Sequence, residues 1–303
     1  MNDHAQFDVP APEALLAGDF SGMAIDDTGT PGHLAPSVHL HPQRKTWVAV
    51  LIPPEEMAEV SKNLPGTIAH VCSCLGVDEL HFADILSGKG PMRGLPYEAR
   101  VDAFRVFARV FAVLRLPIIM QTYSPDNVLE QQESLSRYGK VAGIFDLHDP
   151  SDLALLGLLW RTRSFIAENS AAFHKPLLAF LDEGRFRAGR AIQLGSLLDF
   201  AHQGALFVAS SRDVALLQLA DFAAFALNRV QRLLAKSDRS ERDQELLEIL
   251  AGADFQGIAM RRTSLDAVRD WSTADFDALH ETIRKDRGLH PIPGRGRRRR
   301  DDS

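Results

Sequence analysis

The segment 213–234 constrains the fold most, because it is predicted to form a long helix that is apolar on nearly all of its faces. Such a helix is stable only where other elements cover it on every side. One acid, Asp221, lies near its middle, and a carboxylate without a partner is costly to bury. Two interpretations stay open: Asp221 is satisfied by Arg212, by Arg229 or as a cap elsewhere, or it belongs to a charged site.

Short apolar segments interspersed with helical ones predict the elements around this helix. The predicted strands cover 20–25, 46–52, 117–123, 176–181 and 205–209, and the main predicted helices cover 55–64, 98–114, 152–169, 213–234 and two segments within 240–284. Helices interspersed with strands are typical of an α/β domain. We expect a mixed β-sheet of about five strands flanked by helices, with room for an antiparallel start between the first two strands.

The composition favours a cytoplasmic protein of average globular character. The 303 residues include only two cysteines, Cys72 and Cys74, so no disulfide framework is implied. No apolar run approaches the ~18 residues that a membrane helix needs, and no secretory signal is visible, so we expect no membrane association. We predict a flexible lead-in over 1–19, the α/β domain over 20–237, a helical extension over 238–284 and a basic disordered tail over 285–303.

Four acids lie where this fold would bring them together. Asp26 and Asp182 follow the first and fourth predicted strands, Glu79 lies in the segment Asp78-Glu79-Leu80-His81, and Asp221 lies in the apolar helix. Strand ends at one edge of a sheet are where α/β proteins bind ligands. The alternative for Asp26 and Asp182 is ordinary turn chemistry, because each precedes turn-forming residues. The hypothesis therefore depends on the set of acids.

Clustered carboxylates repel one another unless a cation lies between them. Mg²⁺ and Mn²⁺ prefer such hard oxygen ligands, and two of them ~3.5–4 Å apart can activate a water and stabilise a leaving oxygen in phosphoryl transfer. We therefore predict a site for Mg²⁺ or Mn²⁺, of the two-metal kind, and phosphodiester hydrolysis. A phosphatase or phosphotransferase is a weaker alternative.

Five blocks of the sequence carry a family resemblance. The blocks are Ile25-Asp26-Asp27-Thr28-Gly29, Glu79-Leu80-His81-Phe82, Ser87-Gly88-Lys89-Gly90, Phe180-Leu181-Asp182-Glu183 and Ser211…Gln218-Leu219-Ala220-Asp221-Phe222. In order and approximate spacing they resemble an uncharacterised bacterial and phage family catalogued as domain of unknown function 3800. The resemblance covers about residues 20–235 and implies an RNase-H-like fold with an acidic metal site.

Carried over by position, the resemblance implies that Asp26, Asp182 and Asp221 are catalytic metal ligands and that Glu79 or His81 completes the site. Glu79 and His81 are two residues apart, so an extended segment places both on one face; a surface glutamate and a packed histidine are the alternative. The family usually reads Asp-Glu-Ser-Gly after the first strand, whereas this chain reads Asp-Asp-Thr-Gly. The secondary candidates are Asp27, Glu183 and Gln218.

Basic residues provide candidate contacts to nucleic acid. Lys89 and Arg93 lie in a glycine-rich loop that lets a phosphate backbone approach closely, with a solvated flexible loop as the alternative. The tail 295–300 holds five arginines, which favour either non-specific nucleic-acid binding or a solubilising end. The segment 238–284 is a candidate contact for a protein partner or a second copy.

The net charge of −6 is unevenly distributed: residues 1–150 carry a balance of −8 and residues 151–303 one of +2. An acidic total disfavours a protein that grips long duplexes through a broad basic face, but divalent ions would offset the charge of an acidic site. The sequence thus predicts a metal-dependent nuclease acting on DNA or RNA. The alternative is a non-catalytic protein that keeps the fold and binds nucleic acid or a protein partner.

Overall fold

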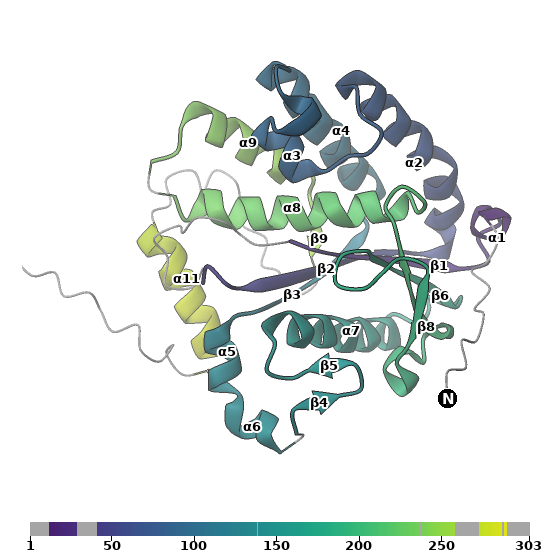
Figure 1. Cartoon of the computed structure of the whole chain (residues 1–303), viewed down its shortest axis with the longest axis vertical. Coiled ribbons are helices and arrows are strands. Elements are labelled where there is room, and N and C mark those ends of the chain that lie inside the picture. The colour runs from purple at the N-terminus through teal and green to yellow at the C-terminus, as the bar shows by residue number, and fades with distance from the viewer. Residues whose placement is uncertain are drawn as a thin grey trace, which may run out of the picture.

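A seven-stranded β-sheet lies between two layers of helices in the computed structural model, which describes residues 12–28, 41–137, 139–236, 238–257, 273–286 and 288–289 (Figure 1). The strand order is β7-β8-β6-β1-β2-β3-β9. The strands are β1 (Ser21–Asp27), β2 (Lys45–Ile52), β3 (Pro117–Tyr123), β6 (Leu177–Asp182), β7 (Arg190–Gln193), β8 (Ala201–Ala209) and β9 (Gln256–Gly257). Two further short strands, β4 (Val141–Ala142) and β5 (Phe145–Asp146), form a separate ribbon.

The sheet is mixed, as predicted. β1 pairs antiparallel with β2, and β2 pairs antiparallel with β3. On its other side β1 pairs parallel with β6, and β6 pairs parallel with β8. The strands β1, β6 and β8 therefore run in the same direction, and their carboxyl ends lie at the same edge of the sheet.

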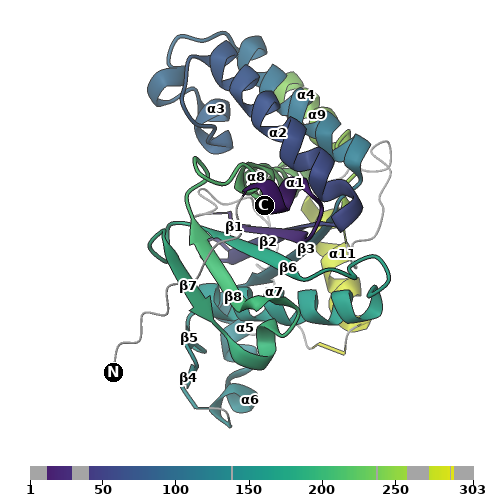
Figure 2. The ribbon, with the colours of Figure 1, turned by 90° about the vertical axis from the view of Figure 1, so that its right-hand side faces the viewer.

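Helices cover both faces of the sheet (Figures 1 and 2). One face carries α2 (Pro54–Leu75), α3 (Phe82–Ser87), α4 (Tyr97–Leu114), α8 (Leu216–Leu234) and α9 (Glu241–Ala251), and the other face carries α7 (Pro150–Glu168). The remaining helical elements are α1 (Pro12–Leu16), η1 (Gly90–Met92), α5 (Pro125–Glu130), α6 (Gln132–Ser136), η2 (Gly195–Leu198) and α11 (Thr273–Asp286). Among the described residues, no helix is both long and apolar enough to cross a lipid bilayer.

Alternation along the strands divides the buried residues into two cores. In β1, Ala24 packs into the core on the α8 side, whereas Met23 and Ile25 pack into the core on the α7 side. In β6, Phe180 belongs to the α8 side and Leu181 to the α7 side. Successive side chains of a strand point to opposite faces, so the position of a residue in the strand decides which helix layer it meets.

The long apolar helix is α8, and it packs across β1 and β2. Most of its first half is buried, including Leu217, Leu219 and Phe222, because α3, α4 and α9 cover the side that faces away from the sheet. The helix begins at Leu216 rather than at residue 213. This burial agrees with the apolar character of the segment and places Asp221 between the sheet and α3.

Three parts of the fold differ from the prediction. The sheet has seven strands instead of about five, because the short edge strands β7 and β9 have no distinct apolar alternation. The helix predicted at 55–64 continues through Pro65 to Leu75, since proline removes only one N–H and the last turns bury Val71, Cys72 and Leu75. The segment 124–150 forms α5, α6 and the β4–β5 ribbon.

The predicted extension over 238–284 packs against the α/β domain through residues 238–257. Its helix α9 packs against α4 and α8, and β9 extends the sheet beside β3. The predicted lead-in includes α1, which packs against α2. Residues 1–11 of the lead-in and 290–303 of the tail, with its arginines, lie outside the described residues.

Candidate acidic site

The register between β1 and β6 places two carboxylates on the same face of the sheet. Ala24 pairs with Phe180 across these parallel strands, and both side chains lie on the α8 side. Asp26 lies two residues after Ala24, and Asp182 lies two residues after Phe180. Because side chains alternate along a strand, both acids point to that same face at the carboxyl ends of their strands. Asp182 continues the pairing of β6 with β8, opposite Ala209.

Asp221 joins these two carboxylates from α8. Burial raises the pKa of Asp26 well above its usual value, and the charges of Asp221 and Asp182 raise it further. Burial also raises the pKa of Asp182 to about 6 and that of Asp221 to about 7. Three acids from three elements therefore share one poorly solvated region, where each disfavours ionisation of the others.

The main partners of these carboxylates are backbone N–H groups. The N–H of Asp27 donates to Oδ1 of Asp26 over 2.7 Å. The N–H of Phe82 donates to Asp221, whereas the N–H of Glu183, which bonds to the carbonyl of Ala209, lowers the pKa of Asp182 from close by. Oδ1 of Asp182 is buried and has no hydrogen-bond partner in the described part of the chain. A buried acceptor of this kind is costly unless a cation or water satisfies it.

The ion pair that is one of the two interpretations of Asp221 is absent from the described residues. Arg212 pairs with Glu79, and Arg229 lies 3.5 Å from Asp243. The interpretation that one of these arginines neutralises Asp221 is therefore wrong. The cost of burying this acid is met instead by its raised pKa and by the Phe82 N–H.

Glu79 lies at the margin of the acidic region and is held by three side chains. Ser211 donates a hydrogen bond to Oε1, and Nε of Arg212 donates to Oε2 over 2.7 Å. Nε2 of His81 lies 3.5 Å from the same Oε2. Burial alone would raise the pKa of Glu79, but these partners lower it below its usual value. Glu79 is thus a fixed anion, in contrast to Asp26.

His81 is 60% exposed and occupies the residue before α3, with extended backbone. Glu79 lies in the same loop before that helix. Because Nε2 of His81 is 3.5 Å from Oε2 of Glu79, the two side chains lie side by side, as their spacing predicts. The positive charge of a protonated His81 would lower the pKa of both Asp182 and Asp221. This imidazole therefore lies close enough to influence the buried carboxylates while remaining open to solvent.

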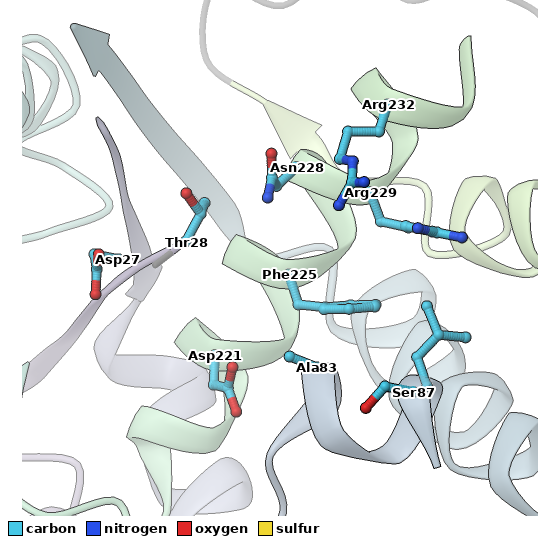
Figure 3. A pocket seen from close by; sticks show the side chains of 10 residues that line it. Asp27, Thr28, Ala83, Ser87, Asp221, Phe225, Asn228, Arg229 and Arg232 are labelled. Carbon is cyan, nitrogen blue, oxygen red and sulfur yellow. The ribbon is translucent and has the colours of Figure 1, made fainter. Parts of the chain in front are cut away.

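A cavity of about 400 Å³ opens beside Asp221 (Figure 3). Its lining residues come from the end of β1, from α3 and from one side of α8: Asp27, Thr28, Ala83, Leu86, Ser87, Asp221, Phe225, Asn228, Arg229 and Arg232. Figure 3 shows Asp221 and Phe225 on successive turns of α8, with the two arginines farther along the same helix. The cavity thus has an acidic part and a basic part.

The other predicted residues take different places. Gln218 is buried, and its Oε1 has no hydrogen-bond partner among the described residues; it lines a second cavity of about 480 Å³ together with Glu79. Glu183 is exposed and its N–H donates to the carbonyl of Ala209. Lys89 and Arg93 are exposed at the two ends of η1, and neither lines the cavity beside Asp221.

The three carboxylates offer oxygen donors of the kind that divalent cations such as Mg²⁺ prefer. Within the described residues, however, no three His, Cys, Asp or Glu side chains are grouped closely enough to hold one ion as they stand. Mg²⁺ is usually bound by one or two carboxylates, with waters and substrate phosphates as its other ligands. The unsatisfied Oδ1 of Asp182 is one acceptor that could take part in such a contribution.

Sequence reasoning missed several residues of this region. Ser211 begins one of the five blocks that carry the family resemblance, so the sequence did contain a signal for it. Arg44, which is buried beside Asn228, carried no signal, because the loop before the second strand has no recognisable pattern.

No protein-family model, curated protein or solved structure matches this chain. The resemblance to the family of unknown function therefore stays a prediction, and the chemistry has to be argued from the site itself.

Proposed function

We propose that this chain is a divalent-metal-dependent nuclease with an RNase-H-like core, which hydrolyses phosphodiester bonds. The observation that carries the proposal is the convergence of Asp26, Asp182 and Asp221 from β1, β6 and α8 on one side of the sheet. A mixed sheet with helices on both faces is in keeping with the fold that the family resemblance implies.

The cost of this arrangement supports a ligand-binding role over a structural one. Each of the three acids has a pKa above its usual value, so the folded chain is destabilised by their ionisation at neutral pH. A structural role needs carboxylates that are paired, as Glu79 is. Clustered carboxylates with perturbed pKa values, one of which lines a cavity, are instead typical of functional sites.

In this proposal Asp26, Asp182 and Asp221 hold Mg²⁺ or Mn²⁺, and Glu79 assists them. The bound cations would supply the positive charge that activates a water and stabilises the leaving oxygen in phosphoryl transfer. The chain positions the ligands rigidly, because two of them end strands in the middle of the sheet and the third lies on a buried helix. Rigid placement reduces the reorganisation that the reaction requires.

His81 provides a group that can move a proton at the mouth of the site. Oε2 of Glu79 faces Nε2 of His81, which favours the tautomer that carries its proton on Nε2. Nδ1 can then accept a proton from an attacking water or return one to a leaving oxygen. Ser211 and Arg212 keep Glu79 ionised for this orienting role.

The test is cleavage by the purified full chain of labelled single-stranded DNA, double-stranded DNA and RNA–DNA hybrid, with Mn²⁺ and with EDTA. We expect Mn²⁺-dependent cleavage of at least one substrate by the wild type and a loss of at least about 100-fold in Asp182→Asn, since a metal ligand supplies several kcal/mol of transition-state stabilisation. Asp199→Asn is the matched control, because Asp199 is an exposed carboxylate paired with Arg163 of α7.

Calorimetric titration with Mn²⁺ adds a readout that does not depend on activity. The wild type and Asp199→Asn should bind Mn²⁺, and Asp182→Asn should bind it more weakly. Equal cleavage by the wild type and Asp182→Asn, with both folded by circular dichroism, would contradict the proposed site. Hydrolysis of p-nitrophenyl phosphate without cleavage of any nucleic acid would favour a phosphatase instead.

A further inference from the structure

Arg44 is a buried arginine whose charge has no carboxylate beside it in the described structure. It lies just before β2 and is only 5% exposed. Its Nη2 donates to Oδ1 of Asn228 over 2.6 Å, and its Nη1 donates to the carbonyl of His41 over 3.4 Å. Its Nε has no hydrogen-bond partner among the described residues. Burial lowers the pKa of Arg44 to about 10, so it stays charged at neutral pH.

Two more arginines approach from α8. The charge of Arg232 lowers the pKa of both Arg44 and Arg229, after the larger effect of burial, so Arg232 lies near each of them. Arg229 lies 3.5 Å from Asp243, but Asp243 also accepts hydrogen bonds from Lys236 and Ser240. The charge of Arg44 has no carboxylate beside it in the described part of the structure, and a bound anion would offset the cost of burying that charge.

The basic cluster of Arg44, Arg229 and Arg232 reaches the cavity through α8. Asn228, Arg229 and Arg232 all line it, and Figure 3 shows them together on one side of the helix. Arg44 acts through Asn228: an amide whose oxygen accepts from Arg44 offers its nitrogen as a hydrogen-bond donor. The side chains that line this end of the cavity are therefore an amide and two guanidinium groups.

Helix geometry sets the distance between the basic cluster and the acidic site. Asp221 and Arg229 are eight residues apart on α8, which corresponds to about 12 Å along the helix axis. Phe225 lies between them and also lines the cavity. One small phosphate group cannot occupy both ends, whereas a chain of phosphodiesters can place one phosphate at each.

We propose that the basic cluster binds a phosphate of a nucleic-acid strand other than the phosphate cleaved at the acidic site, with Asn228, Arg229 and Arg232 in contact and Arg44 as a positioning residue. The identity of the substrate rests on the proposed function, but the anion site does not. Arginine is suited to this role because its planar fork matches phosphate oxygens and stays charged.

The test measures binding in EDTA, where no cleavage occurs. The affinity of a fluorescent thymidine octanucleotide is followed by anisotropy over a range of salt concentrations, and inorganic phosphate is added as a competitor. We expect Arg232→Gln and Arg229→Gln each to weaken binding by about 10-fold, as loss of a charge-assisted hydrogen bond predicts. Each should also reduce the slope of log K against log[salt] by roughly 0.7.

Arg137→Gln is the matched control, because Arg137 is an exposed arginine beside α6 that pairs with Glu133. It should leave the affinity and the salt slope unchanged. Arg44→Lys keeps the charge but loses the fork that holds Asn228, so it should weaken binding less than the α8 variants do. Arg44 is buried, and its substitution can unfold the chain. In that case the binding of the two α8 variants alone decides the outcome.

The outcomes separate this inference from the proposed function. If both α8 variants bind the octanucleotide with the affinity and salt slope of the wild type, the anion site is overturned, whatever the nuclease assay shows. If the α8 variants lose binding while the wild type cleaves no substrate, the anion site stands and the nuclease proposal fails. Where the wild type does cleave, the α8 variants should raise KM and leave kcat nearly unchanged.

Discussion

Nε of Arg212 donates to Oε2 of Glu79 over 2.7 Å, so the arginine that precedes α8 neutralises the acid that precedes α3. This pairing leaves Asp26, Asp182 and Asp221 without an arginine or lysine partner among the described residues, and it divides the carboxylates into two kinds. Glu79 is held ionised, whereas Asp26, Asp182 and Asp221 are held toward protonation.

Ser211→Ala tests how Glu79 is held. The hydroxyl of Ser211 donates to a partly buried carboxylate, so its loss should lower the free energy of unfolding by about 1 kcal/mol. Arg212 is exposed, so the loss of stability in Arg212→Gln should be smaller and should fade at high salt. Urea denaturation at two ionic strengths measures both. The control is Ser136→Ala, whose exposed hydroxyl donates to the carbonyl of Glu133 in its own helix; a larger effect there would contradict the assignment.

The stability of the metal-free chain should depend on pH through its raised carboxyl groups. A folded-state pKa above the unfolded one means that the folded chain binds more protons, so the stabilising contribution is present at low pH and is lost as pH rises. With folded values of about 6 for Asp182 and about 7 for Asp221, the loss should occur between about pH 4 and pH 7.

Asp221→Asn removes one of these titrations. In EDTA its free energy of unfolding should fall less than that of the wild type between pH 5 and pH 8, by about 1–2 kcal/mol. Asp199→Asn should follow the wild type over this range, because Arg163 lowers the pKa of Asp199 and moves its titration to lower pH. Parallel curves for the wild type and Asp221→Asn would show that Asp221 is not a buried acid with a raised pKa.

Phe82→Ala should destabilise the chain by about 3–5 kcal/mol, the usual cost of truncating a buried phenylalanine. Phe82 is fully buried at the start of α3, where its ring contacts Phe104, Phe107 and Phe222. The same residue donates its N–H to Asp221, so the variant should also change the pH dependence of unfolding. Trp160→Ala is the control: Trp160 is 62% exposed, and its loss should change stability by less than about 0.5 kcal/mol.

Two glycine substitutions should have opposite signs. A Cβ at Gly22 in β1 would lie 2.9 Å from Sδ of Met57 and 3.2 Å from Cδ1 of Ile52, so Gly22→Ala should destabilise the chain by about 1–3 kcal/mol through overpacking. A Cβ at Gly66 in α2 would have no described atom within 4 Å beyond the backbone of its own helix and its chain neighbours, so Gly66→Ala should stabilise the chain by about 0.5–1 kcal/mol. The thermal unfolding temperature of each variant measures these effects. A higher unfolding temperature for Gly22→Ala than for the wild type would contradict the packing between β1 and α2.

The sequence was sufficient to predict the central strands and helices of the fold, but it was insufficient to predict the strands at the edges of the sheet. The strand predicted at 117–123 matches β3, and the helix predicted at 98–114 matches α4 to within one residue, because both carry a strong apolar pattern. The strands β7 and β9 gain their stability from pairing with β8 and β3, a tertiary effect that leaves no local pattern. The same reason explains why the extension could not be predicted to join the sheet.

For the site, the sequence indicated which acids lie at strand ends but not how their charges are balanced. Asp26 and Asp182 could be placed by alternation, since each ends an apolar run. The pairing of Arg212 with Glu79 depends on how the loops before α8 and α3 approach each other, over 133 positions of sequence separation. The burial of Arg44 beside Asn228 is equally non-local and had no signal in either segment.

The alternation of β1 and β6 means that the acidic site is encoded in strand length as well as in residue type. One residue inserted between Gly22 and Asp26 would turn Asp26 toward α7, while Asp182 and Asp221 would keep their places. Loops elsewhere can change length without this effect. A descendant of this chain could therefore retain every acid and still lose the chemistry through a single codon gained within β1, a change that a comparison of residue identities alone would pass over.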